Sequence, residues 1–261
     1  MRDPLEGLSE SGTIRTGADI RRVGEAFRPV HHAAIAMIQE RDNSASVYAY
    51  GSVVTGQARV GVSDVDLLTI GPSADDANLI GAELSTRFAG ICRGVEIGVA
   101  KAGDFVGGSD ESYGNRVFLR HYCVLLAGPD LRHPKHDFAG DRHAARGFNG
   151  DIGRHAHRWR NALDAGEETG LIAQRMARKS LLAVAGLVSI HDHTWTTDRE
   201  TSADRWSRVA PEHRAGLARL MSWTSIAPEP PVETVRDVLD GTVESIVSAF
   251  SELIGLWSDD P

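Results

Sequence analysis

The stretch that decides the fold is Tyr50-Gly51-Ser52 followed, eleven residues after Ser52, by Ser63-Asp64-Val65-Asp66-Leu67. Short apolar runs adjoin both pieces, over residues 46–50 and 64–70, and each run stops at a glycine. This pattern predicts two β-strands. We expect the first strand to end at the Gly-Ser pair and to lead into a helix, and the second strand to carry the two aspartates.

The Gly-Ser pair predicts a binding site for phosphate. At a turn from a strand into a helix, backbone N–H groups point outward together and attract an anion. Gly51 has no Cβ to block close approach, and the Ser52 hydroxyl is an additional donor. The alternative is that both residues only form a turn.

The two aspartates predict a divalent metal site. On a strand, the i, i+2 spacing of Asp64 and Asp66 places both carboxylates on one face while Val65 and Leu67 enter the core. Aligned carboxylates repel each other unless a cation lies between them, and Mg²⁺ prefers such oxygens completed by phosphate and water. Ordinary strand-end aspartates are the alternative, but the two motifs at this spacing favour the metal site.

A third carboxylate is expected at Glu96. It is the one acid in the apolar run over residues 94–100, which predicts a further strand. A lone carboxylate on a buried strand face costs several kcal/mol, on the order of 2–7, unless it is paired or bound to metal. The alternative is a solvated residue on an edge strand.

The rest of the chain predicts an α+β fold, with a mixed sheet flanked by helices in front and an all-helical bundle behind. The front half, residues 1–140, adds three further segments with strand or helix patterns. The back half, residues 141–261, has only helical patterns after a connection that contains glycine and histidine. In front we expect helical residues 19–40 (interrupted at Pro29), a helix over 73–88 and a strand over 122–127; behind, helices over 151–165, 168–192, 201–208, 211–222 and 232–257.

Composition limits the class of partner. The 261 residues include 36 acidic and 28 basic ones, for a net charge of −8 and a pI near 5.8. This balance disfavours a broad nucleic-acid binder, which needs clustered positive charge, and suits a neutral or cationic small molecule. Cys92 and Cys123 are too few for a disulfide framework. No apolar run is long enough for a membrane span, and the polar start does not resemble a signal peptide, so we expect a cytoplasmic protein.

Two further patterns favour ordinary structural roles. Paired histidines near 133–136, 155–157 and 191–193 lack a matched partner pair at a known metal-site spacing, and we attribute them to surface or capping positions. The acidic run over residues 104–111 contains two glycines and predicts a loop.

The Tyr50-Gly51-Ser52 and Ser63-Asp64-Val65-Asp66-Leu67 motifs resemble the signature of the nucleotidyltransferase superfamily that includes DNA polymerase beta. Within it, the whole chain is most similar to the bacterial aminoglycoside nucleotidyltransferases that adenylylate streptomycin and spectinomycin. The similarity extends to residues 122–130, to 178–187, and to 202–206 and 210–213. It implies an enzyme that takes ATP as its substrate and uses two Mg²⁺ ions.

The resemblance also implies roles for individual residues. Gly51, Ser52 and Ser63 match positions that contact nucleotide phosphates. Asp64 and Asp66 match metal ligands, and Glu96 matches a third acid that is also the general base. Arg199 lies near a basic position that contacts ATP.

The acceptor is not fixed by the resemblance. The family's acidic residue before Arg178 is absent from 174–177, an expected arginine falls near Gly186, and residues 112–116 replace a tryptophan-containing substrate segment. We therefore expect AMP transfer to a hydroxyl of a small molecule, with an aminoglycoside antibiotic as the leading candidate. A protein or RNA acceptor, and a nucleotide-binding protein without turnover, are the alternatives, and the oligomeric state is left open.

Overall fold

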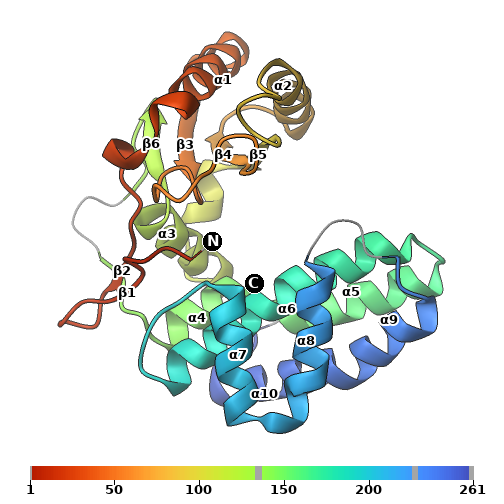
Figure 1. The fold of residues 1–261 in the computed structure, drawn as a ribbon. Coiled ribbons are helices and arrows are strands. Elements are labelled where there is room, and N and C mark those ends of the chain that lie inside the picture. Colours follow the sequence, from red (N-terminus) through yellow and green to blue (C-terminus); the bar gives the residue numbers. More distant parts are fainter. Residues whose placement is uncertain (1, 133–136, 225–228, 259–261) are drawn as a thin grey trace. The chain divides into compact units, whose positions relative to one another are not determined.

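A computed structural model describes residues 2–132, 137–224 and 229–258 of the chain (Figure 1). Its contacts group the chain into two units. The first contains Met1–Glu6, Ile14–Gly108 and Asn115–Phe138, and the second contains Gly7–Thr13, Ser109–Gly114 and Ala139–Pro261. The main change from one unit to the other is at residue 138, and the second unit also takes two short segments from the front half. Each unit is described by itself below.

The first unit is built on a four-stranded mixed sheet with the strand order β5-β4-β3-β6. Strand β3 (Ser46–Tyr50) pairs antiparallel with β4 (Val65–Ile70) and with β6 (Val124–Ala127), whereas β4 pairs parallel with β5 (Val95–Ala100). The mixed sheet expected from the sequence is therefore confirmed, and β5 is one of its edges.

Two helices cover one face of this sheet (Figure 1). They are α1 (Arg28–Arg41), with Pro29 in its first turn, and α2 (Ala74–Arg87), whose N-cap Ser73 accepts a hydrogen bond from the backbone N–H of Asp76. Their apolar stripes pack on inward-facing strand residues because alternate strand side chains share a face. The fully buried centre of this core includes Val30, Ala34, Ile38, Val47, Ala49, Val65, Leu67 and Leu84.

The opposite face of the sheet packs against α3 (Asp110–His121), whose Leu119 forms a buried cluster with Tyr48 of β3 and Ile70 of β4. Sequence reasoning missed this helix, and its loop prediction for residues 104–111 is wrong at the end where α3 begins. Asp110 and Glu111 form the first turn of α3, where acidic side chains complement the positive end of the helix dipole.

Short elements complete the front half. The described strands β1 (Gly7–Leu8) and β2 (Ile14–Arg15) have two residues each. The 3₁₀ turns η1 (Ile20–Arg22), η2 (Glu25–Phe27) and η3 (Ala102–Phe105) precede longer elements or loops. The helical region expected over residues 19–40 is thus two 3₁₀ turns followed by α1.

The second unit is helical, as the sequence predicted. Its central helix is α6 (Thr169–His191), which buries most of its residues against the helices that surround it. Sequence reasoning treated the region of α4 as a connection. The remaining elements are α4 (Arg142–Asn149), α5 (Ile152–Asp164), α7 (Arg199–Val209), η4 (Pro211–His213), α8 (Arg214–Trp223), α9 (Val232–Val238), the π-turn η5 (Leu239–Val243) and α10 (Glu244–Leu253).

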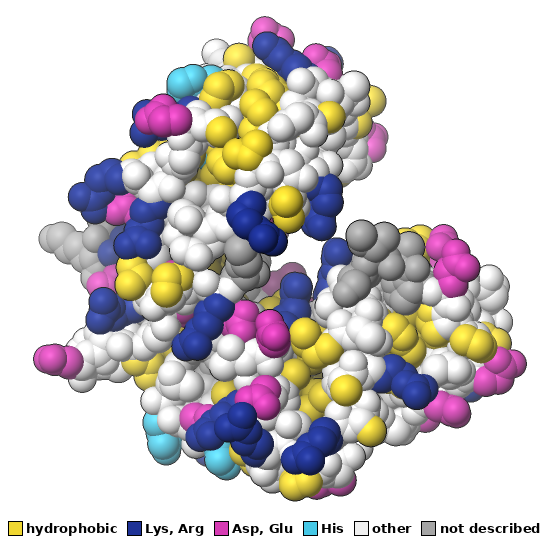
Figure 2. Space-filling model, viewed as in Figure 1, with side chains coloured by type: hydrophobic (Ala, Val, Ile, Leu, Met, Phe, Trp, Pro, Cys, Tyr) yellow, Lys and Arg dark blue, Asp and Glu magenta, His cyan; other side chains and the backbone are white. Residues whose placement is uncertain are grey.

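The surface mixes charges of both signs. On the face drawn in Figure 2, dark blue basic and magenta acidic side chains are interspersed over both units. The net charge of −8 is therefore not gathered into one acidic surface on this face. Among the described helices, none combines the length and the apolar character that a membrane span requires.

Candidate active site

The turn after β3 brings the chain against Asp66. Gly51 has a φ of +75°, and a Cβ placed on it would lie 2.4 Å from Oδ2 of Asp66. Only glycine combines this backbone conformation with that closeness. Residues 51–56 form successive turns in place of the expected helix, closed by a hydrogen bond from the Thr55 N–H to the Gly51 carbonyl (3.3 Å).

Ser52 and Ser63 lie at the two ends of the loop that joins β3 to β4. The Ser52 hydroxyl is half-buried and makes no hydrogen bond within the described residues. The Ser63 hydroxyl is buried and accepts a hydrogen bond from the backbone N–H of Arg59 (2.9 Å), which leaves its own proton to donate. Both hydroxyls can therefore still donate to an anion.

The sheet register aligns a tyrosine and two of the predicted acids across three strands. Tyr50 on β3 is opposite Asp66 on β4, and Asp66 is opposite Glu96 on β5. Paired residues on neighbouring strands point to the same face and their Cβ atoms are about 4.5–5.5 Å apart. Asp64 directly precedes β4 and lies two residues before Asp66. By the alternation of strand side chains, it belongs to the same face of the sheet as Asp66.

The electrostatics of this row reveal concentrated negative charge. Burial, followed by the charges of Glu96 and Asp64, raises the pKa of Asp66 to about 6, while the charge of Arg93 opposes the shift. Burial, followed by the charge of Asp66, also raises the pKa of the Tyr50 phenol. The chain thus holds a carboxylate where its ionised form is disfavoured, a condition common at functional sites.

Arg93 is a member of this site that sequence reasoning missed. Its Nε donates to Oδ1 of Asp64 (3.0 Å), and its Nη2 contacts Oδ2 of the same carboxylate. The two residues are 29 positions apart in the chain. The parallel register of β4 and β5, with Val65 opposite Val95, brings them together. A basic residue just before the strand that carries Glu96 was the available signal, but its use requires the strand pairing.

The residues fit the magnesium that the resemblance implies, although they are not arranged as a ready metal cluster. Within the described part of the chain, no three His, Cys, Asp or Glu side chains are grouped closely enough to hold a metal ion. The donor set is nevertheless appropriate, because carboxylates supply the hard oxygen ligands that Mg²⁺ prefers, and one of the three, Asp66, lies directly against the Gly51 turn. Burial and the neighbouring acids disfavour the ionised form of Asp66, and a bound cation would stabilise it.

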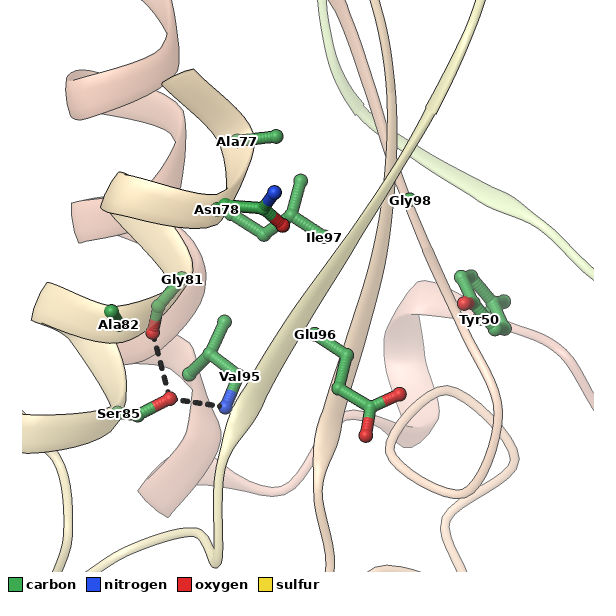
Figure 3. Close-up of a pocket in the computed structure, with 10 residues that line it drawn as sticks. All are labelled: Tyr50, Ala77, Asn78, Gly81, Ala82, Ser85, Val95, Glu96, Ile97 and Gly98. Carbon is green, nitrogen blue, oxygen red and sulfur yellow. Dashed lines mark hydrogen bonds between the residues drawn. The ribbon is translucent and has the colours of Figure 1, made fainter. Parts of the chain in front are cut away.

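A pocket of about 470 Å³ adjoins Glu96 (Figure 3). It lies between α2 and the edge strand β5 and continues around to Tyr50. Among the residues that the structure describes, Glu96 is the one charged residue that lines this pocket. Ser85 has both of its hydrogen bonds satisfied, since its hydroxyl donates to the Gly81 carbonyl (2.7 Å) and accepts from the Val95 N–H (2.8 Å). The other lining residues are small, apolar or amide-bearing: Ala77, Asn78, Gly81, Ala82, Ile97 and Gly98.

Arg199 belongs to the second unit, as the first residue of α7. Burial and then the charge of Arg178 on α6 lower the pKa of its guanidinium, and Asp198 opposes them only in part. Its buried Nε has no hydrogen-bond partner among the described residues. A desolvated arginine with a like charge nearby is a suitable place for an anion.

The histidine pairs fit the structural roles expected for them where they are described. His155 lies 3.1 Å from Asp151, and His191 lies 2.8 Å from Asp192. The pair at 133 and 136 lies outside the described residues.

Comparison with known families and structures identifies the front domain. Residues 34–101 match the family model described as a nucleotidyltransferase domain, and this range contains Gly51, Ser52, Ser63 and all three carboxylates. The predicted superfamily is therefore confirmed for this domain, and the chain is an enzyme of the nucleotidyltransferase class. The comparison with curated proteins finds no match.

Among solved structures, the chain is similar to spectinomycin adenyltransferase AAD(9) from Enterococcus faecialis, determined with ATP and spectinomycin. The TM-score is 0.53 at 11% sequence identity, over 84% of this chain and 98% of that one. At this identity the likeness concerns the fold, and it confirms the predicted combination of a mixed-sheet domain and a helical region.

Proposed function

We propose that the protein is a Mg²⁺-dependent adenylyltransferase, which transfers AMP from ATP to a hydroxyl of a small molecule and releases pyrophosphate. The observation that carries this proposal is the row of Tyr50, Asp66 and Glu96 across three strands, with Asp66 against the Gly51 turn. Gly51, Asp66 and Glu96 lie in the domain that matches the nucleotidyltransferase model.

The nucleotide is proposed to bind through its phosphates at the loop between β3 and β4. The backbone at Gly51 allows close approach, and the hydroxyls of Ser52 and Ser63 each have a proton to donate. Arg199 is proposed as a further nucleotide contact, supported by its desolvated guanidinium. We place the activity in the cytoplasm, where ATP is available.

Asp64 and Asp66 are the proposed ligands of two magnesium ions, with Glu96 as the third acid. When bound, the metal supplies stabilisation for the negative charge that develops on the phosphate oxygens. The contribution of the chain is to hold three carboxylates on one side of the sheet, close to the phosphate-binding loop.

In the proposed reaction, Glu96 accepts the proton of the acceptor hydroxyl. The hydroxyl oxygen forms a bond to the α-phosphorus of ATP, the bond from that phosphorus to the oxygen bridging to the β-phosphate breaks, and pyrophosphate leaves with that electron pair. Glu96 is exposed at the edge strand and lines the adjoining pocket, so an acceptor can reach its carboxylate.

The acceptor is proposed to be a polyhydroxylated small molecule, and an aminoglycoside is the first to test. Of the described residues that line the pocket beside Glu96, none has a positive side chain, which suits a neutral or cationic acceptor and disfavours an anionic one. The solved relative binds ATP and spectinomycin, and its fold is similar to that of this chain.

The test is pyrophosphate release from ATP and Mg²⁺ with a panel of aminoglycosides and aminocyclitols, measured for the wild type and for Asp64→Asn. We expect release that depends on one acceptor and on Asp64. No release above the Asp64→Asn background with any drug would overturn the drug-modifying activity.

A parallel incubation with labelled ATP and cell lysate tests the alternatives. A labelled protein or RNA would assign a macromolecular acceptor. Tight binding of ATP and Mg²⁺ without turnover in either experiment would assign a nucleotide-binding protein.

A further inference from the structure

Asp64 has both carboxylate oxygens occupied by one arginine. Arg93 Nε donates to Oδ1 (3.0 Å), while Nη2 contacts Oδ2. Two parallel contacts from a planar guanidinium make the strongest geometry available to an ion pair. A side chain proposed above as a metal ligand is therefore held by a cation that belongs to the chain itself.

Backbone hydrogen bonds hold the two chain segments that carry the ion pair, whereas the Arg93 guanidinium is exposed to solvent. The Arg93 backbone N–H donates to the Ser63 carbonyl (3.1 Å), and the Val65 N–H donates to the Gly94 carbonyl (2.9 Å), so the two chain segments are joined beside the pair. The Arg93 side chain is 62% exposed, whereas that of Asp64 is 18% exposed. The guanidinium can therefore leave the carboxylate for solvent without disturbing the strands.

Arg93 is also the cation that balances this group of acids. Its guanidinium pairs with Asp64, and the other two acids, Asp66 and Glu96, are paired with each other across β4 and β5 on the same face of the sheet. Among the described residues, neither Glu96 nor Asp66 takes part in an ion pair of its own. The positive charge of Arg93 thus partly compensates three carboxylates.

We propose that Arg93 is the resident counter-ion of the carboxylate site and competes with the divalent cation for Asp64. This rests on the proposed function, because it takes Asp64 as a metal ligand. Arg93 is a positioning residue: it fixes the Asp64 carboxylate in the metal-free protein and releases it when the metal binds. Its effect is to lower the affinity of the protein alone for metal.

The test is a Mn²⁺ titration of the full-length protein without nucleotide, with free Mn²⁺ followed by electron paramagnetic resonance. Arg93→Gln removes the competing charge and keeps a polar side chain of similar length. Arg87→Gln is the matched control, since Arg87 is an exposed arginine of the same unit that lies over the Phe88 ring at 5.2 Å and forms no ion pair among the described residues. Asp64→Asn reports binding that does not involve the site.

We expect Arg93→Gln to bind Mn²⁺ roughly 3- to 10-fold more tightly than the wild type, as loss of a partly exposed ion pair predicts. Arg87→Gln should match the wild type, and Asp64→Asn should bind weakly or not at all. In chelator, Arg93→Gln should melt at a lower temperature than the wild type, and saturating Mn²⁺ should close that gap. A role limited to holding the fold would lower the melting temperature equally in both conditions.

Two failures are distinguishable. If Arg93→Gln is folded and binds Mn²⁺ no more tightly than the wild type, while Asp64→Asn loses binding, the competition is refuted and the metal site stands. If the wild type binds no Mn²⁺, or Asp64→Asn binds it equally well, the proposed metal site fails and the competition fails with it.

Discussion

The acids at the edge of the sheet and the arginines of α6 and α7 carry opposite charges, but both groups are incompletely compensated. Asp66 is a half-buried carboxylate beside two other acids, and its pKa is raised to about 6. Arg199 is a largely desolvated guanidinium near Arg178, and its pKa is lowered. In each case burial is the main cause and a like charge is the next.

The two regions differ in how far neighbouring residues of opposite charge compensate them. On the acidic side a cation from the chain, Arg93, is already in contact with one carboxylate. On the basic side, Asp198 relieves Arg199 in part, and the Nε remains without a partner among the described residues. The two regions therefore favour ligands of opposite sign.

The largest expected effect is that of Asp64→Asn on catalysis. Asparagine keeps the shape of the side chain but removes the charge that is proposed to hold the metal, so pyrophosphate release should fall by at least about 10²- to 10³-fold, as for loss of a group that stabilises transition-state charge. Asp75→Asn, an exposed aspartate in the first turn of α2, is the matched control and should keep its rate. Equal rates of pyrophosphate release for Asp64→Asn and Asp75→Asn would show that Asp64 is not needed for the reaction.

Gly51→Ala should damage both the fold and the reaction. The added methyl would strain a backbone at φ +75° and meet the Asp66 carboxylate at 2.4 Å, so we expect a loss of about 1–3 kcal/mol in the free energy of unfolding. Gly61→Ala separates the two causes, because Gly61 has φ +74° but no atom within 4 Å of the new Cβ. It should lose stability through strain alone and keep more activity. The same activity in both variants would show that closeness to Asp66 is unimportant.

Arg199→Gln tests the basic region. The KM for ATP should rise by about 10- to 150-fold, since one charged contact to phosphate is worth about 1.5–3 kcal/mol. Without nucleotide, the variant should be as stable as the wild type or more so, because a desolvated and repelled charge is removed. Arg175→Gln, at an exposed position of α6, should change neither quantity. A clear loss of stability in Arg199→Gln, with an unchanged KM, would make Arg199 a structural residue.

A further effect, which depends on pH, is expected on the stability of the metal-free protein. Because the folded pKa of Asp66 is raised above its ordinary value of 3.8, its contribution is fully present below that value and is lost as pH rises through about 6. At pH 8, the free energy of unfolding of Asp66→Asn, measured by denaturant titration, should therefore exceed that of the wild type by up to about 2–3 kcal/mol. Near pH 4 the two proteins should be equally stable.

His31 titrates in the same window with the opposite sign, so the comparison must be made between proteins at each pH. Burial, followed by the charge of His32, lowers the pKa of His31 from 6.5 to about 4. A lowered histidine pKa makes the folded protein lose stability as pH falls from about 6.5 to about 4. This contribution cancels in the difference between Asp66→Asn and the wild type. A gain that is the same at pH 4 and pH 8 would contradict the raised pKa of Asp66.

Strand periodicity made the carboxylates predictable. Alternation along a strand places Asp64 and Asp66 on one face, and the same reasoning found the strand of Glu96. Helix α3 was missed, because its polar sequence with Gly114 in the middle reads as a loop until Leu119 packs on the sheet. The Arg93 contact depends on which strands are neighbours, which periodicity does not specify.

The parallel pairing of β4 with β5 has a consequence for how this gene can change. The register joins Asp66 to Glu96 through a segment of the chain that includes α2. A shift of β5 by one residue would turn Glu96 into the core and bring Val95 or Ile97 to the acidic face. An insertion or deletion between the two strands is therefore tolerated if β5 keeps its present register with β4, whatever the length of the connecting segment. A lineage that lengthens the loops around α2 keeps its chemistry if β5 re-pairs in its present frame, and loses it through a one-residue slip that would leave the hydrogen bonding of the sheet intact.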